Sequence, residues 1–201
     1  MSEAQGHYMS DIDRSVITFG LGSAGSGKTY CATAMAGQML HYGEIDKIII
    51  TRPAVQSGVG LGFLPGSLED KYRPYIEPVK SVLEDRHGKG WFDCQIKKGN
   101  IEVVPLEFMQ GRTFDSAFVL ADEMQNSTPN EMFMLLSRVG RNCKVVVNGD
   151  HKMQKMIRGV SGLEDAATRL KGINGVSLYT FTSKDCVRSG IARDIIKRYE
   201  D

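Results

Sequence analysis

Eight consecutive residues near the amino terminus have the composition and spacing of a phosphate-binding loop. They are Gly22, Ser23, Ala24, Gly25, Ser26, Gly27, Lys28 and Thr29. Glycines let backbone N–H groups wrap phosphate oxygens, the lysine reaches the β- and γ-oxygens of a nucleoside triphosphate, and the threonine hydroxyl can ligate Mg²⁺. We therefore expect this P-loop to bind the phosphates of ATP, with Mg²⁺ on Thr29.

An acidic pair, Asp122 and Glu123, directly follows the apolar run 117–121. Ligands of open α/β sheets gather at the carboxyl ends of parallel strands. We expect Asp122 to hold Mg²⁺, directly or through water, and Glu123 to act as the general base that polarises the attacking water. Such a pair on its own is more often a helix cap, so the interpretation depends on the glycine loop upstream.

Further polar residues, Asn148, Gly149 and Asp150, follow the apolar run that begins at Lys144, and Gln154 comes shortly after them. They either sense the γ-phosphate or form an ordinary polar turn. The four histidines and four cysteines lack the spacing of a metal cluster, and the cysteines form no Cys-x-x-Cys pair. We therefore expect neither a zinc site nor a disulfide framework.

Apolar runs and helical stretches alternate along the chain. Strands are predicted at 16–21, 47–51, 101–104, 117–121, 144–148 and 176–182, and helices at 28–41, 67–87, 129–139, 163–171 and 185–199. This alternation predicts a three-layer α/β fold, a mostly parallel sheet with helices on both faces. The Gly- and Pro-rich segment 52–66 is too long for a simple connection and is a candidate functional loop.

The composition is that of an ordinary globular protein, with 41% hydrophobic and 24% charged residues in 201. It predicts one domain over residues 1–201. No run approaches the roughly 18 apolar residues of a membrane span, and the amino terminus does not resemble a signal peptide, so we expect a cytoplasmic location. The net charge of +1 does not identify a partner, although the carboxy-terminal third is mildly basic.

Several ordered motifs resemble those of the PhoH-like ATPases, phosphate-starvation-inducible P-loop proteins related to the nucleotide-binding core of superfamily 1 helicases. Besides the strand that enters the P-loop, these motifs lie at 51–55, 61–66, 110–113, 121–126 and 185–189. The resemblance covers nearly the whole chain. It implies a RecA-like core, ATP with Mg²⁺, and an activity linked to RNA or single-stranded nucleic acid.

The resemblance also implies roles for single residues. Gln5, three residues before Tyr8, is similar to a glutamine that reads adenine in helicase-like relatives. Arg188 resembles an arginine that stabilises charge on the γ-phosphate. Gln125 resembles the last residue of an Asp-Glu-x-Gln motif. Gln154 resembles a sensor glutamine, but one extra residue separates it from Asp150. Lys28, Glu123, Arg188 and Gln154 are thus the candidate catalytic residues.

The leading hypothesis is an ATPase coupled to RNA or single-stranded DNA, in which Arg52, Arg112 and Arg138 contact phosphates. These arginines could equally form ion pairs within the fold, and Phe63 is the obvious candidate for base stacking. The alternative is an ATP-switched assembly protein without a nucleic-acid substrate. A small-molecule kinase is disfavoured by the acidic pair. Since the chain has room for one core, a second core at Arg188 would come from another subunit, which predicts a homo-oligomer, with a ring as one form.

Overall fold

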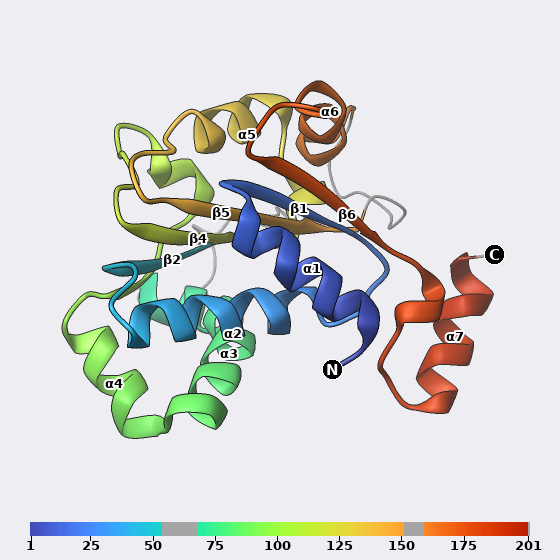
Figure 1. Cartoon of the computed structure of the whole chain (residues 1–201), viewed down its shortest axis with the longest axis horizontal. Coiled ribbons are helices and arrows are strands. Elements are labelled where there is room, and N and C mark those ends of the chain that lie inside the picture. Colours follow the sequence, from blue (N-terminus) through green and yellow to red (C-terminus); the bar gives the residue numbers. More distant parts are fainter. Residues whose placement is uncertain (54–67, 151–158, 201) are drawn as a thin grey trace.

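The computed structural model of the chain describes residues 1–53, 68–150 and 159–200 (Figure 1). Most of the predicted functional loop at 52–66 lies outside the described residues. So does Gln154, and so do the positions of Phe63 and of the motif at 61–66.

Six parallel strands form one sheet in the described residues, in the order β3-β2-β4-β5-β1-β6. Every neighbouring pair is parallel, whereas the sequence predicted a mostly parallel sheet. The strands are β1 (Ile17–Gly22), β2 (Lys47–Thr51), β3 (Ile101–Val103), β4 (Ala117–Ala121), β5 (Lys144–Gly149) and β6 (Val176–Phe181). The strands of the sheet's centre, β4 and β5, are almost entirely buried because helices cover both of their faces.

Helices lie on both faces of this sheet, which gives the predicted three layers (Figure 1). One face carries α1 (Glu3–Arg14), α2 (Lys28–His41), α3 (Leu68–His87) and α4 (Lys89–Lys97), and the other carries α5 (Pro129–Leu136) and α6 (Gly162–Arg169). The helix α7 (Gly190–Glu200) stands at the carboxy-terminal end. Short 3₁₀ turns are η2 (Leu106–Met109), η3 (Met124–Asn126) and η4 (Ser183–Asp185). None of the described helices is both long and apolar enough to cross a membrane.

The first helix, α1, was not predicted from the sequence, and a buried tyrosine is among the residues that hold it to the sheet. Ser2 and Gln5 form a capping box at its start. The Tyr8 hydroxyl donates a hydrogen bond to Asn148 Oδ1 at 2.5 Å, and the Tyr8 ring meets Phe181 edge-on at 5.2 Å. This tyrosine therefore ties the amino terminus to the ends of β5 and β6.

Tyr8 packs tightly against the sheet at Gly20 in β1. A Cβ atom at this position would lie 2.6 Å from the Tyr8 hydroxyl and closer still to Asn148 Oδ1. Because both neighbours are fully buried, neither has room to move away. We expect Gly20→Ala to lower the free energy of unfolding by about 1–3 kcal/mol, measured by urea denaturation.

Gly6→Ala is the matched control, since nothing lies within 4 Å of a Cβ at that position in α1. Replacing an open helical glycine should leave stability unchanged or raise it by up to about 1 kcal/mol. Equal effects of the two substitutions would contradict the packing described for Tyr8.

Candidate active site

Three glycines give the P-loop its shape. Gly22, Gly25 and Gly27 have φ angles of +112°, +79° and +87°, which side-chain-bearing residues rarely adopt. At Gly22 a Cβ would also overlap the backbone carbonyl of Phe181 in β6. Gly27 is the N-cap of α2, so the positive end of the helix dipole and its free N–H groups face the loop.

The Lys28 ammonium group lies inside the curve of this loop. It donates to the carbonyl oxygens of Gly22 at 2.6 Å and Ser23 at 2.7 Å, and to Ser26 Oγ at 3.3 Å. The loop thus holds a positive charge where its own carbonyls converge. That charge, together with the α2 N-terminus, makes the loop attractive to phosphate oxygens.

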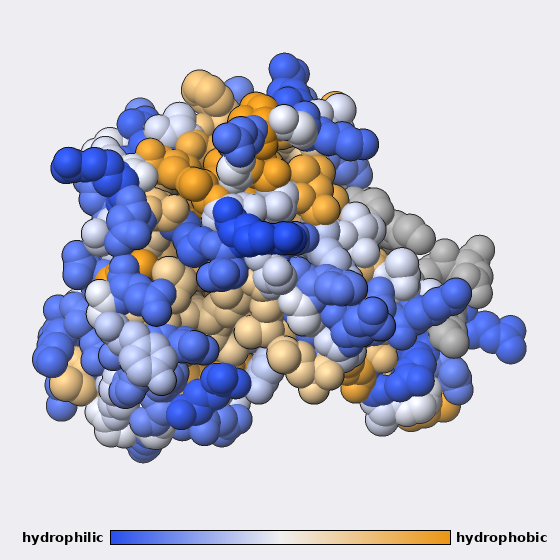
Figure 2. Space-filling model, viewed as in Figure 1, coloured by the Kyte–Doolittle hydropathy of each residue, from blue (hydrophilic) through white to orange (hydrophobic). Residues whose placement is uncertain are grey.

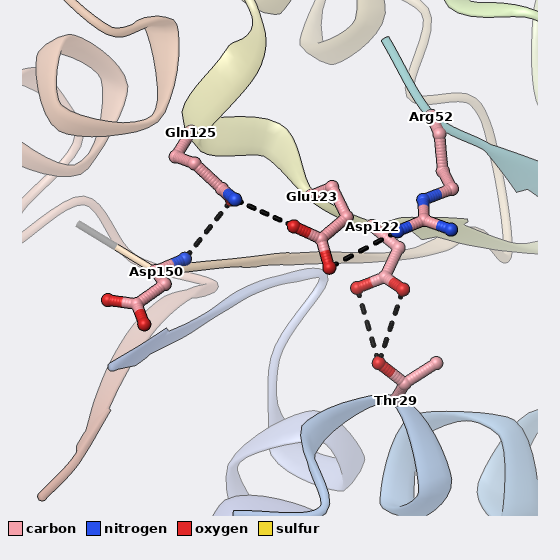
Figure 3. Close-up of polar contacts among 6 residues, drawn as sticks. All are labelled: Thr29, Arg52, Asp122, Glu123, Gln125 and Asp150. Carbon is pink, nitrogen blue, oxygen red and sulfur yellow. Dashed lines mark hydrogen bonds and ion pairs between the residues drawn. The ribbon is translucent and has the colours of Figure 1, made fainter. Parts of the chain in front are cut away.

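The P-loop meets the predicted acidic pair at Thr29. The Thr29 hydroxyl lies 3.2 Å from both carboxylate oxygens of Asp122, which follows β4 (Figure 3). Burial raises the pKa of Asp122, and the charge of Glu123 adds to this, while Arg52 and the Thr29 hydrogen bond oppose it. A hydroxyl and a carboxylate are hard oxygen donors, so this pair fits Mg²⁺ chemically.

Glu123 is held at both of its carboxylate oxygens. Arg52 Nη2 lies 3.1 Å from Oε1, and the Gln125 amide donates to Oε2 at 2.6 Å (Figure 3). The backbone of Glu123 is left-handed, with φ +55°, which is strained for a residue with a side chain. The contacts with Arg52 and Gln125 hold the carboxylate beside Asp122 (Figure 3).

Gln125 also links this acid to the next strand. Its side-chain oxygen accepts a hydrogen bond from the Asp150 backbone N–H at 3.1 Å, and its own carbonyl accepts one from the Ser161 hydroxyl at 2.9 Å. The residue is almost fully buried. The Gln125 side-chain amide therefore joins Glu123 to the end of β5, and the Gln125 backbone carbonyl binds the start of α6.

A pocket of about 250 Å³ opens beside these groups. Its walls come from the P-loop, the acidic pair, the end of β5 and Arg188 of the same chain. The Arg188 side chain packs on Gly25, where a Cβ would lie 2.9 Å from Arg188 Cδ, and the Val187 N–H donates to the Gly25 carbonyl at 3.0 Å. Arg188 thus reaches the site in cis, so its position gives no structural reason for a second subunit.

The family model for PhoH-like proteins matches residues 1–200. The chain belongs to the PhoH-like protein family. It is 43% identical over 197 residues to a PhoH-like protein of Bacillus subtilis, covering 98% of the chain and 62% of the relative. It is 40% identical over 201 residues to Protein PhoH of Escherichia coli K12, covering 98% and 57%. The chain therefore spans about three fifths of the length of these relatives.

Among solved structures, the chain is similar to the Pif1 helicase of Candida albicans, with a TM-score of 0.45 and 15% identity over 90% of this chain and 40% of that one. Family membership and the glycine loop identify the PhoH-like chain as a nucleotide-binding P-loop NTPase. Its six-stranded parallel sheet with helices on both faces confirms the predicted fold class.

Gln5 of the PhoH-like chain lies beside the P-loop rather than at an open surface. Its amide nitrogen donates to the Ser26 carbonyl at 3.1 Å, and its amide oxygen accepts from the Ser2 backbone N–H at 2.9 Å. Both ends of the amide therefore contact the protein, and Gln5 supports the loop from behind. Adenine recognition by Gln5 stays a prediction.

A second, larger hollow of about 700 Å³ lies between α1 and the segment after β6. Its lining includes His7, Tyr179, Lys184 and Val187. Because Val187 is bonded to the P-loop through Gly25, this hollow adjoins the phosphate pocket. The sequence did not point to it, since its walls come from opposite ends of the chain.

Two of the three arginines predicted to contact phosphates make ion pairs within the fold. Arg52 pairs with Glu123, and Arg112 pairs with Glu102 at 2.6 Å. The Nε atom of Arg138 is buried and has no hydrogen-bond partner among the described residues. Two aromatic side chains that were not predicted to be functional are largely exposed: Phe108 by 64% and Phe133 by 75%.

Glu102 supplies a pH-dependent test of the ion pairs. Burial alone would raise its pKa, but hydrogen bonds from Lys47 and Arg112, with their charges, lower it below the ordinary value of 4.5. A depressed pKa stabilises the fold above pH 4.5, and that contribution is lost as pH falls through the folded-state value. We expect Glu102→Gln to cost about 1 kcal/mol near neutral pH, with the difference from wild type shrinking in acid.

Urea denaturation at several pH values measures this difference. The control is Glu77→Gln, because Glu77 is more exposed and its contact with Lys80 is longer, at 3.8 Å. If Glu102→Gln lowers the free energy of unfolding by the same amount down to strongly acidic pH, the charge of the Glu102 carboxylate does not stabilise the fold.

Proposed function

We propose that this chain hydrolyses ATP with Mg²⁺ and couples hydrolysis to RNA or single-stranded DNA. The observation that carries the hydrolytic part is the position of Glu123. Its carboxylate is fixed by Arg52 and Gln125 at the edge of the pocket that the P-loop and the Thr29–Asp122 pair also line. A base held in this way is suited to orient a water molecule against the terminal phosphate.

The other residues of the pocket would bind and orient the triphosphate. Lys28 would exchange its loop carbonyls for β- and γ-oxygens, and Arg188 would stabilise charge on the γ-phosphate from within the same chain. Thr29 and Asp122 would hold Mg²⁺. When bound, Mg²⁺ supplies neutralisation of phosphate charge. Because Gln125 also binds Asp150 after β5 and Ser161 before α6, a movement of Glu123 would shift these two segments as well.

The nucleotide base and ribose would extend from the P-loop into the hollow between α1 and the segment after β6. This hollow adjoins Gly25 through Val187 and presents Tyr179, His7 and Lys184 to a ligand. Aromatic and polar side chains of this kind suit a nucleoside, which has stacking faces and hydrogen-bonding edges.

Two features support the nucleic-acid part of the proposal. Arg52 follows β2 at the start of the predicted functional loop, and it pairs with Glu123, the candidate general base. A nucleic-acid strand that binds Arg52 would therefore act directly on this residue. The exposed rings of Phe108 in η2 and Phe133 in α5 lie on elements that pack against each other. Exposed aromatic rings are the usual stacking platforms for single-stranded bases.

A specific observation also favours the alternative, an ATP-switched assembly protein. Val187, Ile191 and Ile195 follow one another at intervals of four residues at and before α7, and each is more than half exposed. Such an apolar stripe suits a protein partner, including a second copy of the chain. Because Val187 is bonded to the P-loop, assembly through this stripe would respond to nucleotide, and the predicted homo-oligomer would use it.

Steady-state ATP hydrolysis with Mg²⁺, with and without single-stranded RNA or DNA, tests the proposal. We expect Lys28→Ala to abolish hydrolysis, because it removes the charge that binds the β- and γ-phosphates. Glu123→Gln should lower the rate about 100-fold or more while ATP still binds, since the neutral amide cannot accept a proton. Lys171→Ala and Glu44→Gln, both at exposed positions, are the matched controls.

If RNA or single-stranded DNA stimulates ATP hydrolysis, and Lys28→Ala abolishes this stimulation, coupling to nucleic acid is supported. Hydrolysis that depends on Lys28 but ignores every strand would favour the assembly protein. An unchanged rate in Glu123→Gln would refute the general-base role.

A further inference from the structure

Four aromatic side chains gather where α2, α3 and α4 meet. They are His41 and Tyr42 at the end of α2, His87 at the end of α3, and Trp91 in α4. The ring centroids of His87 and Trp91 are 4.5 Å apart with the planes tilted by 31°, and those of His41 and His87 are 5.2 Å apart with a tilt of 32°. Tyr42 meets His41 edge-on at 5.3 Å and is 69% exposed. The rings thus form a short stack that ends in exposed faces.

Two glycines make this stack possible. The His87 ring lies directly on α2 at Gly37, where a Cβ would be 2.9 Å from His87 Nε2. Gly88, with φ +88°, turns the chain between α3 and α4 and brings Trp91 back over His87. Burial, followed by the positive charges of His41 and Arg86, lowers the pKa of His87. The lowered pKa favours the neutral form of this central ring near pH 7.

A pocket of about 440 Å³ opens beside these rings. It is lined by Gln38, His41, Tyr42, Arg86 and His87, and no carboxylate is among the described residues that line it. The volume falls within the range of small-molecule sites, about 300–1,000 Å³. One guanidinium, one amide and several ring faces suit a planar, hydrogen-bonding ligand with negative charge.

This pocket is separate from the P-loop. The two lie at opposite ends of α2, whose 14 residues span about 20 Å at 1.5 Å per residue. Around the end of α2 and α4 the surface in view is mainly hydrophilic, whereas hydrophobic surface gathers beside α6 (Figure 2). The surroundings therefore suit a polar, charged ligand better than an apolar protein face.

We propose that this pocket is a second nucleotide-binding site, where a base stacks on Tyr42 and His41 and Arg86 pairs with its phosphate. The Gln38 amide can both donate to and accept from a base edge. The guanidinium of Arg86 matches phosphate geometry, and base–aromatic stacking adds affinity with little preference for sequence. The same chemistry is offered by a free nucleoside monophosphate and by a nucleotide within a single strand. This site does not require the hydrolysis proposed above.

Trp91 provides the readout, because it is the only tryptophan of the chain and belongs to the ring cluster. Its fluorescence would be titrated in the Lys28→Ala background with uridine monophosphate and with a short oligouridylate. Ribose 5-phosphate, which lacks the base, is the reference probe. We expect base-containing ligands to change the Trp91 emission saturably, and Tyr42→Ala and Arg86→Gln each to weaken binding about tenfold.

Lys171→Gln is the matched control for Arg86→Gln, because it removes an exposed positive charge elsewhere and should leave the titration unchanged. Saturation by uridine monophosphate would identify a free nucleotide as the ligand, and saturation by the oligonucleotide alone would identify a strand. A Trp91 emission that responds to neither ligand, or equally to ribose 5-phosphate, would overturn the proposal. So would a titration that Tyr42→Ala and Arg86→Gln leave unchanged, in proteins whose circular dichroism is also unchanged.

Discussion

The candidate active site depends on the parallel register of three neighbouring strands, β1, β5 and β4. Leu21 stands opposite Gly149, and Ala121 stands opposite Val147, so these strands reach the same edge of the sheet together. The P-loop, Asp150 and the acidic pair leave the sheet side by side as a result. The contact between Thr29 and Asp122 follows from this register. An antiparallel β1 would carry the P-loop to the opposite edge of the sheet, and an antiparallel β4 would carry the acidic pair there.

A network of polar side chains then fixes the charges that the register brings together. Burial of Asp122 disfavours its ionised form, and the neighbouring Glu123 adds to that effect. Arg52 opposes both, and Gln125 holds the second oxygen of Glu123 against the end of β5. The left-handed backbone at Glu123 is maintained by these contacts, as strained conformations at functional sites usually are. Within the described residues, Arg52 thus joins the segment after β2 to the acidic pair.

Local patterns in the sequence predicted the strands and the P-loop because continuous apolar runs and glycine spacing are local signals. The strand predicted at 117–121 matches β4, and the helix predicted at 28–41 matches α2. The helices α1 and α4 escaped prediction because their sequences are largely polar and contain glycine. Contacts such as Gln5 with Ser26 and Arg112 with Glu102 could not be predicted, since they depend on which strands become neighbours. The same holds for the ring cluster at His87, which three helices assemble.

The central claim is that the P-loop, the Thr29–Asp122 pair and Glu123 act on one triphosphate in one pocket. A crystal structure of the Glu123→Gln variant with ATP and Mg²⁺ tests it most directly. The account predicts the triphosphate along residues 25–29, Mg²⁺ coordinated by Thr29 and Asp122, and the substituted side chain facing the γ-phosphate together with Arg188. Mg²⁺ bound away from Asp122, or a triphosphate outside the glycine loop, would contradict it.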